Sequence, residues 1–329
     1  MKRRSILVLI TCLIPLRPQA QDVQQRAETL LDKARQLSDI RSPNAPAFRL
    51  KATFSFVGKN LETAQGTYTE VWVSNSQWRR ETIVNDWHRI EVGGPTRLWL
   101  LDSAGDFPEP AAQLPGVLAI FPSSLMSLAF DSISDHPELD PPAECAVTRP
   151  DSRQQRSAFC FDKRTGLPLE RILPELRPKN AVVDSCDYGS FQRMGSFLFP
   201  REIACFEDRH RKLDAKVTEL DPEPKPDPAL FTPPQGAIEL GRCPVKPDPP
   251  RATPHFNPRF PSGVQTQSSQ VTLSLVVDTK GKPQDVKVVG SGGTEFDQAA
   301  ISAVRDWRFK PGICRGEPMP MPILVQVDF

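Results

Sequence analysis

The sequence lacks the motifs that catalytic and cofactor-binding sites usually carry. It contains no glycine-rich phosphate loop, no nucleophile elbow and no carboxylate pattern with the spacing of acid–base catalysis. Its four histidines are scattered, and its one metal-like pairing is Cys205 with His210, which a disulfide at Cys205 would remove. We therefore expect a protein that is not an enzyme, with no catalytic residues, no metal and no cofactor.

An excess of charge of one sign is also missing. The chain has 41 Lys and Arg against 40 Asp and Glu, a net charge of +1. A nucleic-acid surface needs a basic excess, so we expect no nucleic-acid partner. The apolar run at residues 5–16 has twelve residues. It would make about 18 Å of helix against a hydrocarbon core of about 30 Å, which is too short for a membrane span.

The N-terminus has the pattern of an export signal over residues 1–20. A positive stretch, Lys2 to Arg4, precedes the apolar run, and Ala20 offers a small residue for cleavage before Gln21. Two alternatives remain: an uncleaved inner-membrane anchor, and a lipoprotein signal at Cys12, where Thr11 departs from the usual small residue. The pattern predicts a periplasmic protein, or a protein anchored in the inner membrane if the signal is retained.

Cysteine content agrees with export. Removal of the signal leaves six cysteines: Cys145, Cys160, Cys186, Cys205, Cys243 and Cys314. An even number in an exported chain is typical of disulfides, with fifteen connectivities open. The first two flank a polar turn between strand-like runs, as do the next two, so each pair could lie across a hairpin. The last two then pair by elimination. The alternative is six free, buried thiols.

Residues 22–221 have the pattern of one helix followed by many short strands. Apolar side chains recur at three- and four-residue intervals over 23–37, which predicts an amphipathic helix. Period-two alternation then predicts an antiparallel meander. Its strands are expected at 48–57, 66–73, 78–84, 88–92, 96–101, 143–149, 157–162, 167–173, 181–191, 197–205 and 212–219. The pattern breaks at 107–136, where 125–130 is expected to be a short helix or a loop over the sheet.

A proline-rich connector separates this domain from the end of the chain. Residues 222–261 hold thirteen of the 35 prolines, which disfavours helix and sheet and favours extended chain. Two apolar stretches inside it, Leu230–Phe231 and Ile238–Leu240, predict that parts of the connector pack on the preceding domain.

The last segment, residues 262–329, predicts a small ββαβ domain. Its expected elements are a strand at 271–277, a turn at 278–282, a strand at 286–289, a helix at 296–307 with Thr294 as N-cap, and a terminal strand at 323–329. Pro311 and Gly312 follow the helix and end it.

Three motifs in this segment resemble the C-terminal domain of TonB. They are the hairpin VVDTKGKPQDV at 276–286, the helix end AVRDWRFKPG at 303–312, and the closing strand ending at Phe329. Phe260-Pro261 stands where the family often has Tyr-Pro. The resemblance, over about 260–329, implies a binding domain whose last strand takes up a short segment of an outer-membrane receptor by strand addition. It places candidate contacts on Ile323, Leu324, Val325, Gln326, Val327 and Asp328. The alternative is an edge strand with no partner.

The chain departs from a working energy transducer of that family. It has no N-terminal membrane helix bearing Ser and His together, and no long Pro-Glu/Pro-Lys spacer. Force transmission from the inner membrane is therefore not expected unless the signal stays uncleaved.

Residues of about 22–240 resemble the LolA family of lipoprotein carriers. One helix precedes a long meander, and 161–169, 188–200 and 228–234 look like the family's late strands and closing stretch. The resemblance implies a half-barrel around an apolar cavity for acyl chains, with 114–130 either as a lid or as plain core packing. The expected fold class is α+β: an antiparallel β half-barrel with a helix, then the ββαβ domain. The expected function is periplasmic binding of a receptor segment or another envelope protein; the alternative is a lipid or lipoprotein carrier.

Overall fold

A computed structural model gives the fold of most of the chain. It describes residues 18–57, 63–103, 111, 113–121, 128–150, 156–172, 185–207, 209–243, 245, 247–253, 258, 260, 261 and 269–329. Most of the predicted signal, residues 1–17, lies outside these ranges. Within them, none of the helices has both the length and the apolar character of a membrane span.

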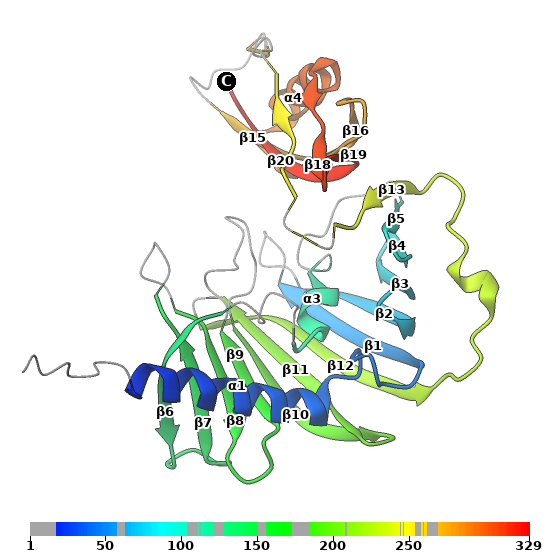
Figure 1. Cartoon of the computed structure of the whole chain (residues 1–329). Helices are drawn as coiled ribbons and strands as arrows, with labels where there is room; N and C mark the ends of the chain where they lie inside the picture. The colour runs from blue at the N-terminus through cyan, green and yellow to red at the C-terminus, as the bar shows by residue number, and fades with distance from the viewer. Residues whose placement is uncertain are drawn as a thin grey trace, which may run out of the picture.

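Thirteen strands form one antiparallel sheet, in the order β13-β5-β4-β3-β2-β1-β12-β11-β10-β9-β8-β7-β6 (Figure 1). Their bounds are β1 Phe48–Val57, β2 Thr63–Ser74, β3 Gln77–Val84, β4 Trp87–Gly93, β5 Arg97–Asp102, β6 Phe130–His136, β7 Ala143–Thr148, β8 Ala158–Asp162, β9 Pro168–Ile172, β10 Ser185–Met194, β11 Phe197–Glu207, β12 His210–Pro222 and β13 Ile238–Gly241. The late strand β12 pairs with β1, so the meander closes on its own beginning at the centre of the sheet.

Two helices cover one face of this sheet (Figure 1). Helix α1, Pro18–Ser38, buries Ala27, Leu31 and Ala34 against the β6–β8 end. Helix α3, Leu114–Leu118, buries its leucines and Val117 in the main core. The predicted alternation of β1 is confirmed, because Phe48, Leu50, Ala52, Phe54 and Phe56 all lie in that core. The α+β class is therefore as predicted.

The break expected at 107–136 is wrong in part. Phe130–His136 forms the edge strand β6, and a short helix lies at 114–118. Residues 128–129 are loop, one of the two alternatives expected for 125–130, and residues 125–127 fall outside the described ranges. β6 could not be recognised from the sequence, because an edge strand tolerates polar and charged side chains, here Asp131 and Asp135.

The connector packs on the first sheet, as its apolar stretches predict. Ile238–Gly241 is β13, which pairs with β5, and the 3₁₀ helix η3, Pro228–Phe231, lies near β3, where the Arg79 guanidinium donates to the Leu230 carbonyl at 3.2 Å. Backbone pairing thus continues from the first domain into the connector.

The last part of the chain forms a three-stranded sheet, β16-β15-β20, with helix α4 on one face. Its elements are β14 Arg251–Ala252, β15 Gln270–Val277, β16 Pro283–Gly290, α4 Thr294–Asp306, β17 Phe309–Lys310, β18 Gly312–Cys314, β19 Glu317–Met319 and β20 Met321–Asp328. The predicted ββαβ elements are present, and the β18–β19 hairpin and the β14–β17 pair are additions.

One local expectation in this part is wrong. The N-cap of α4 is Gly293, with φ 112°, and Thr294 is the first helical residue. Asp297 reaches back from the first turn and accepts from the Gly292 amide at 2.9 Å and the Ser291 hydroxyl at 2.6 Å. A carboxylate inside the helix therefore binds the entering loop, and the N-cap Gly293 has no side chain to accept from the first helical amides.

Three disulfides join the expected pairs, two predicted from the strand pattern and the third by elimination. Cys145–Cys160 and Cys186–Cys205 each bridge residues directly opposite on neighbouring strands, with Cα atoms 4.0 Å and 4.1 Å apart. Cys243–Cys314 ties the connector to β18.

Candidate functional site

The outer edge of β20 is the first candidate site. β20 ends the order β16-β15-β20, and in the described part of the chain no strand pairs with its second edge. Its register with β15 is unbroken, from Gln270 opposite Asp328 to Val277 opposite Met321. The six residues that the family resemblance marks as contacts, 323–328, all lie in this strand.

Two hydrogen bonds fix which backbone groups face outward. The Phe329 amide donates to the Ser269 carbonyl on the β15 side, whereas the Pro320 carbonyl accepts from the Gly241 amide on the opposite side. In an antiparallel ladder the groups of successive residues point to opposite edges. The odd residues of β20 therefore bond to β15, and Leu324, Gln326 and Asp328 present their N–H and C=O to the open edge.

The side chains of β20 also divide by face. Ile323, Val325 and Val327 pack toward α4. Leu324, Gln326 and Asp328 lie on the other face, and Leu324 is 56% exposed. Pro322 has no N–H to donate. Its nitrogen faces away from β15, so the ladder between the two strands loses no hydrogen bond, and a strand tolerates proline at such a position.

The opposite edge, β16, is less suited to accept a strand. Its register with β15 shifts twice, and Asp285 has φ 50°. Bulged, twisted edges resist strand pairing. The Lys287 ammonium of β16 also binds the Asp102 carboxylate of β5 at 2.6 Å, so this edge lies against the first sheet.

The concave face of the first sheet is the second candidate site. It carries large apolar side chains, among them Trp72 and Phe199, in one core with α3. Two arginines bind the last carbonyls of α3: Arg171 donates to Ala119 at 2.6 Å, and Arg41 donates to Leu118 at 2.9 Å. In the described residues α3 therefore packs into the core on this face, which is the core-packing alternative expected for 114–130. Charge-assisted hydrogen bonds hold it there.

A group of buried charges lies beside α3. Glu70 is fully buried and binds both Arg41 and Arg80, the latter at 3.1 Å. Burial alone would raise the pKa of Glu70, but the two guanidinium groups outweigh it and lower the pKa to about 2. Burial raises the pKa of the neighbouring Tyr68 hydroxyl, and the Glu70 charge raises it further. The group stays ionised at neutral pH and fixes the loop after α1 to β2 and β3.

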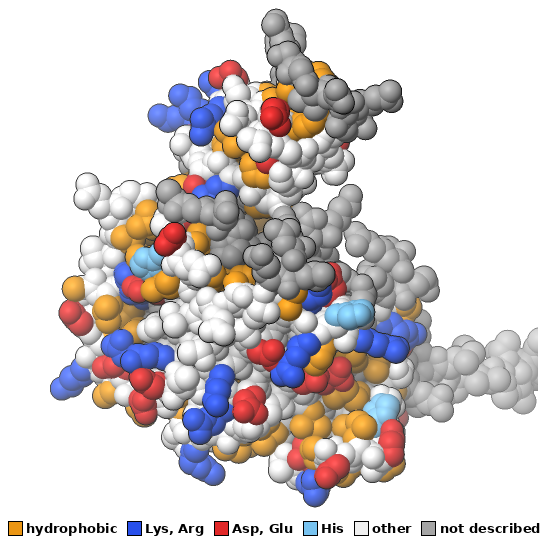
Figure 2. All heavy atoms as spheres, turned by 180° about the vertical axis from the view of Figure 1, so that it is seen from behind, with side chains coloured by type: hydrophobic (Ala, Val, Ile, Leu, Met, Phe, Trp, Pro, Cys, Tyr) orange, Lys and Arg blue, Asp and Glu red, His pale blue; other side chains and the backbone are white. Residues whose placement is uncertain are grey.

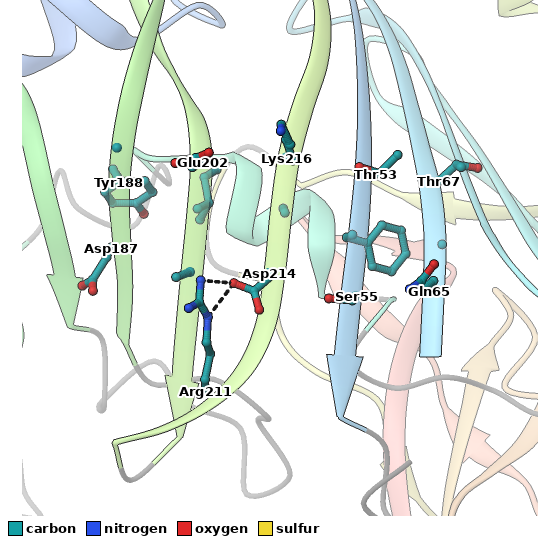
Figure 3. A pocket seen from close by; sticks show the side chains of 16 residues that line it. Thr53, Ser55, Gln65, Thr67, Asp187, Tyr188, Glu202, Arg211, Asp214 and Lys216 are labelled. Carbon is teal, nitrogen blue, oxygen red and sulfur yellow. Dashed lines mark hydrogen bonds and ion pairs between the residues drawn. The ribbon is translucent and has the colours of Figure 1, made fainter. Parts of the chain in front are cut away.

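A polar groove of about 850 Å³ crosses the other face of the first sheet, with α3 behind the strands (Figure 3). Asp187, Ala204, Asp214, Ser55 and Gln65 lie side by side across five strands in its floor. Arg211 pairs with Asp214 at 2.6 Å. This open groove of mixed charge differs from the apolar cavity that a half-barrel carrier implies, and the sequence reasoning did not mark it.

Seen from behind, the surface carries Lys and Arg interspersed with Asp and Glu (Figure 2). No large area of one sign appears on this face, which agrees with the balanced composition. The metal-like pairing is also removed, because Cys205 is bonded to Cys186.

Comparison with known families places the last part of the chain. Residues 257–329 match the family model described as Gram-negative bacterial TonB protein C-terminal, which is the predicted resemblance. No curated protein matches the sequence.

Solved structures similar to this chain include proteins named for lipoprotein sorting, the LolA superfamily and MucB. An outer membrane lipoprotein-sorting protein domain from Vibrio parahaemolyticus has 8% identity and a TM-score of 0.42, covering 63% of this chain and 97% of its own. A LolA superfamily protein from Nitrosomonas europaea has 12% identity and a TM-score of 0.40, with the same coverages. MucB has 17% identity and a TM-score of 0.33, covering 85% of this chain and 96% of its own.

Proposed function

We propose that this chain is a periplasmic binding protein that takes up an extended segment of an envelope protein as an added strand along β20. The outward N–H and C=O groups of Leu324, Gln326 and Asp328 are the observation that carries the proposal. Main-chain hydrogen bonds at such an edge supply affinity, and alternate side chains supply specificity. The periplasm-facing segment of an outer-membrane receptor is the partner that the TonB match favours.

Strand addition requires a partner in the same compartment. Export by a cleaved signal at residues 1–20 would supply it, and three disulfides suit an oxidising compartment. In this proposal 22–221 form the first domain, 222–261 the connector and 262–329 the binding module. N-terminal sequencing of protein purified from the periplasm tests the cleavage, with a first residue near Gln21 expected.

A proline substitution tests the edge itself. Leu324→Pro removes one outward N–H without removing a bond to β15, because the Leu324 amide faces away from the ladder. One main-chain hydrogen bond contributes about 0.5–1.5 kcal/mol, so we expect the affinity for a receptor peptide to fall about threefold to tenfold. Titration calorimetry with a blocked synthetic peptide measures this fall.

Leu324→Ala is the matched control. It removes the exposed side chain but keeps the N–H, so it separates the loss of apolar contact from the loss of the donor. The thermal unfolding of both variants should stay close to that of the unmodified protein. Equal peptide affinities for the proline and alanine variants would exclude addition along this edge.

A second function, the carrying of lipid or acyl chains, is favoured by one observation. The concave face combines large aromatic side chains with a covering helix that polar bonds hold in place. Native mass spectrometry of periplasmic protein tests this function: copurified acyl chains support a carrier, and an empty protein that binds receptor peptides supports the adaptor.

A further inference from the structure

Asp328 places a fixed negative charge at the open end of the β20 edge. Its carboxylate oxygen Oδ1 accepts from the side-chain amides of Gln270 at 2.9 Å and Gln326 at 3.2 Å. Both donors are neutral, and among the described residues no Lys, Arg or His forms an ion pair with Asp328. The carboxylate is thus oriented by its neighbours while its charge stays uncompensated.

Apart from Gln326, the rest of the edge is apolar. Ile323 and Val325 are only half-buried beneath α4, so part of each faces the position of an added strand. At the Asp328 end, Phe329 packs edge-on against Phe296, with ring centroids 5.0 Å apart. On the second face, Leu324 is 56% exposed. An added strand would therefore meet apolar surface everywhere except at Asp328 and Gln326.

The far end of the edge is closed. The Pro320 carbonyl already accepts from the Gly241 amide, and a side chain at position 241 would overlap Met319, so β13 meets β20 closely there. Pro322 offers no N–H. The donors available to a partner are therefore those of Leu324, Gln326 and Asp328, and a partner strand is confined to the residues opposite 322–328.

From these constraints we propose the side chains that the partner segment carries. A basic residue lies opposite Asp328, apolar residues lie opposite Val327, Val325 and Ile323, and a further apolar residue lies opposite Leu324. Side chains of a strand alternate between faces, so the apolar set divides between the α4 face and the Leu324 face. This inference rests on the strand addition proposed above and specifies which segments add.

Short blocked peptides test the pattern. Lys-Val-Thr-Val-Leu-Val presents it to β20 in the antiparallel direction, and the reversed sequence presents it in the parallel direction; each is made again with Glu in place of Lys. Binding of each peptide is measured to the full-length protein and to its Asp328→Lys, Asp306→Lys and Leu324→Pro variants. Asp306 is exposed at the end of α4, so Asp306→Lys makes the same change of charge in the same module away from the edge.

The unmodified protein and Asp306→Lys should prefer the Lys peptide by up to about fivefold, the upper end for an exposed ion pair. Asp328→Lys should prefer the Glu peptide, and high salt should weaken both preferences. An unchanged preference in Asp328→Lys, with Leu324→Pro still weakening binding, overturns the inference and leaves strand addition standing. Equal binding to Leu324→Pro and the unmodified protein overturns both.

Discussion

At the scale of single residues, the carboxylate of Glu70 links the stability of the fold to pH. Its folded pKa of about 2 lies below the ordinary value of 4.5. A lowered pKa means that the unfolded chain binds the proton more readily, so ionised Glu70 favours the folded state above pH 4.5. That contribution falls as the pH drops from 4.5 toward 2, and the shift corresponds to about 3 kcal/mol.

Glu70→Gln tests this contribution. The change leaves Arg41 and Arg80 without their carboxylate in a buried site, so we expect a loss of about 3–5 kcal/mol of unfolding free energy at pH 7. The loss should shrink between pH 4.5 and pH 2. Urea unfolding at several pH values measures it. The control is Glu219→Gln, at an exposed pair with Lys51, where the cost should stay below about 1 kcal/mol. A pH-independent difference between Glu70→Gln and the unmodified protein would contradict the argument.

The sequence predicts the β2–β3 hairpin but not the pairing of Arg80 with Glu70. A tight turn at 75–76 alone would place Glu81 opposite Glu70, and a bulge between Trp72 and Ser74 shifts the register so that Arg80 lies there. Arg41 could not be predicted, because it lies in the loop after α1, and only the tertiary packing of that loop brings it to Glu70. Alternation identifies which positions face inward; it does not show that a charged residue at such a position is paired.

At the scale of elements, α3 depends on side chains from elsewhere in the chain. A helix leaves its last carbonyls without partners, and a helix as short as Leu114–Leu118 has little stability of its own. Arg171, which is almost fully buried, supplies hydrogen bonds to Ala119, Ile120 and Gly116. Arg171 of β9 therefore contributes, together with Arg41, to the position of α3 over the concave face.

Arg171→Met should loosen α3. Hydrogen bonds from a charged donor contribute about 1.5–3 kcal/mol, so the protection of α3 amides against hydrogen exchange should fall about tenfold to a hundredfold. Arg164→Met is the control, since Arg164 is an exposed arginine in the turn before β9. Unchanged protection in Arg171→Met would show that apolar burial and the Arg41 bond to Leu118 hold the helix without Arg171.

The sequence predicted elements where a repeated pattern supports them. Strands that alternate in apolar character and cysteines that flank a turn were enough to place β1, β7, β8, β10 and β11 with two disulfides. The β18–β19 hairpin was missed, because it has only three residues in each strand and includes Pro318. Strands this short show no recognisable alternation of apolar and polar residues. Family resemblance alone identified the six residues proposed at β20. Their division between the two faces of the sheet could be assigned only from the register of β20 with β15.

At the scale of the whole molecule, the β14–β17 pair and the Asp248–Ile313 bridge join the last part of the chain to the connector. In the described residues, three further contacts join it to the β5–β13 end of the first sheet. They are the hydrogen bond from Gly241 to Pro320, the ion pair of Lys287 with Asp102, and the Cys243–Cys314 disulfide. Arg89 also binds Asp102, at 2.7 Å, so the lysine meets a carboxylate that the first sheet already holds in place. The open edge of β20 is thereby given a fixed position beside β13.

Of these three contacts, the disulfide should set how firmly β20 is held beside β13. Cys243 and Cys314 are separated by 71 residues and Cys145 and Cys160 by 15, and loop-closure entropy assigns about 4 and about 3 kcal/mol to such bridges. The stabilised parts differ, because the shorter bridge lies within one hairpin and the longer one spans the connector. Cys243→Ser with Cys314→Ser should therefore speed hydrogen exchange at the Gly241 amide while amides of β7 and β8 keep their protection. Cys145→Ser with Cys160→Ser should do the reverse. Equal exchange at Gly241 with and without the Cys243–Cys314 bridge would show that the Lys287–Asp102 pair and backbone contacts alone hold the edge in place.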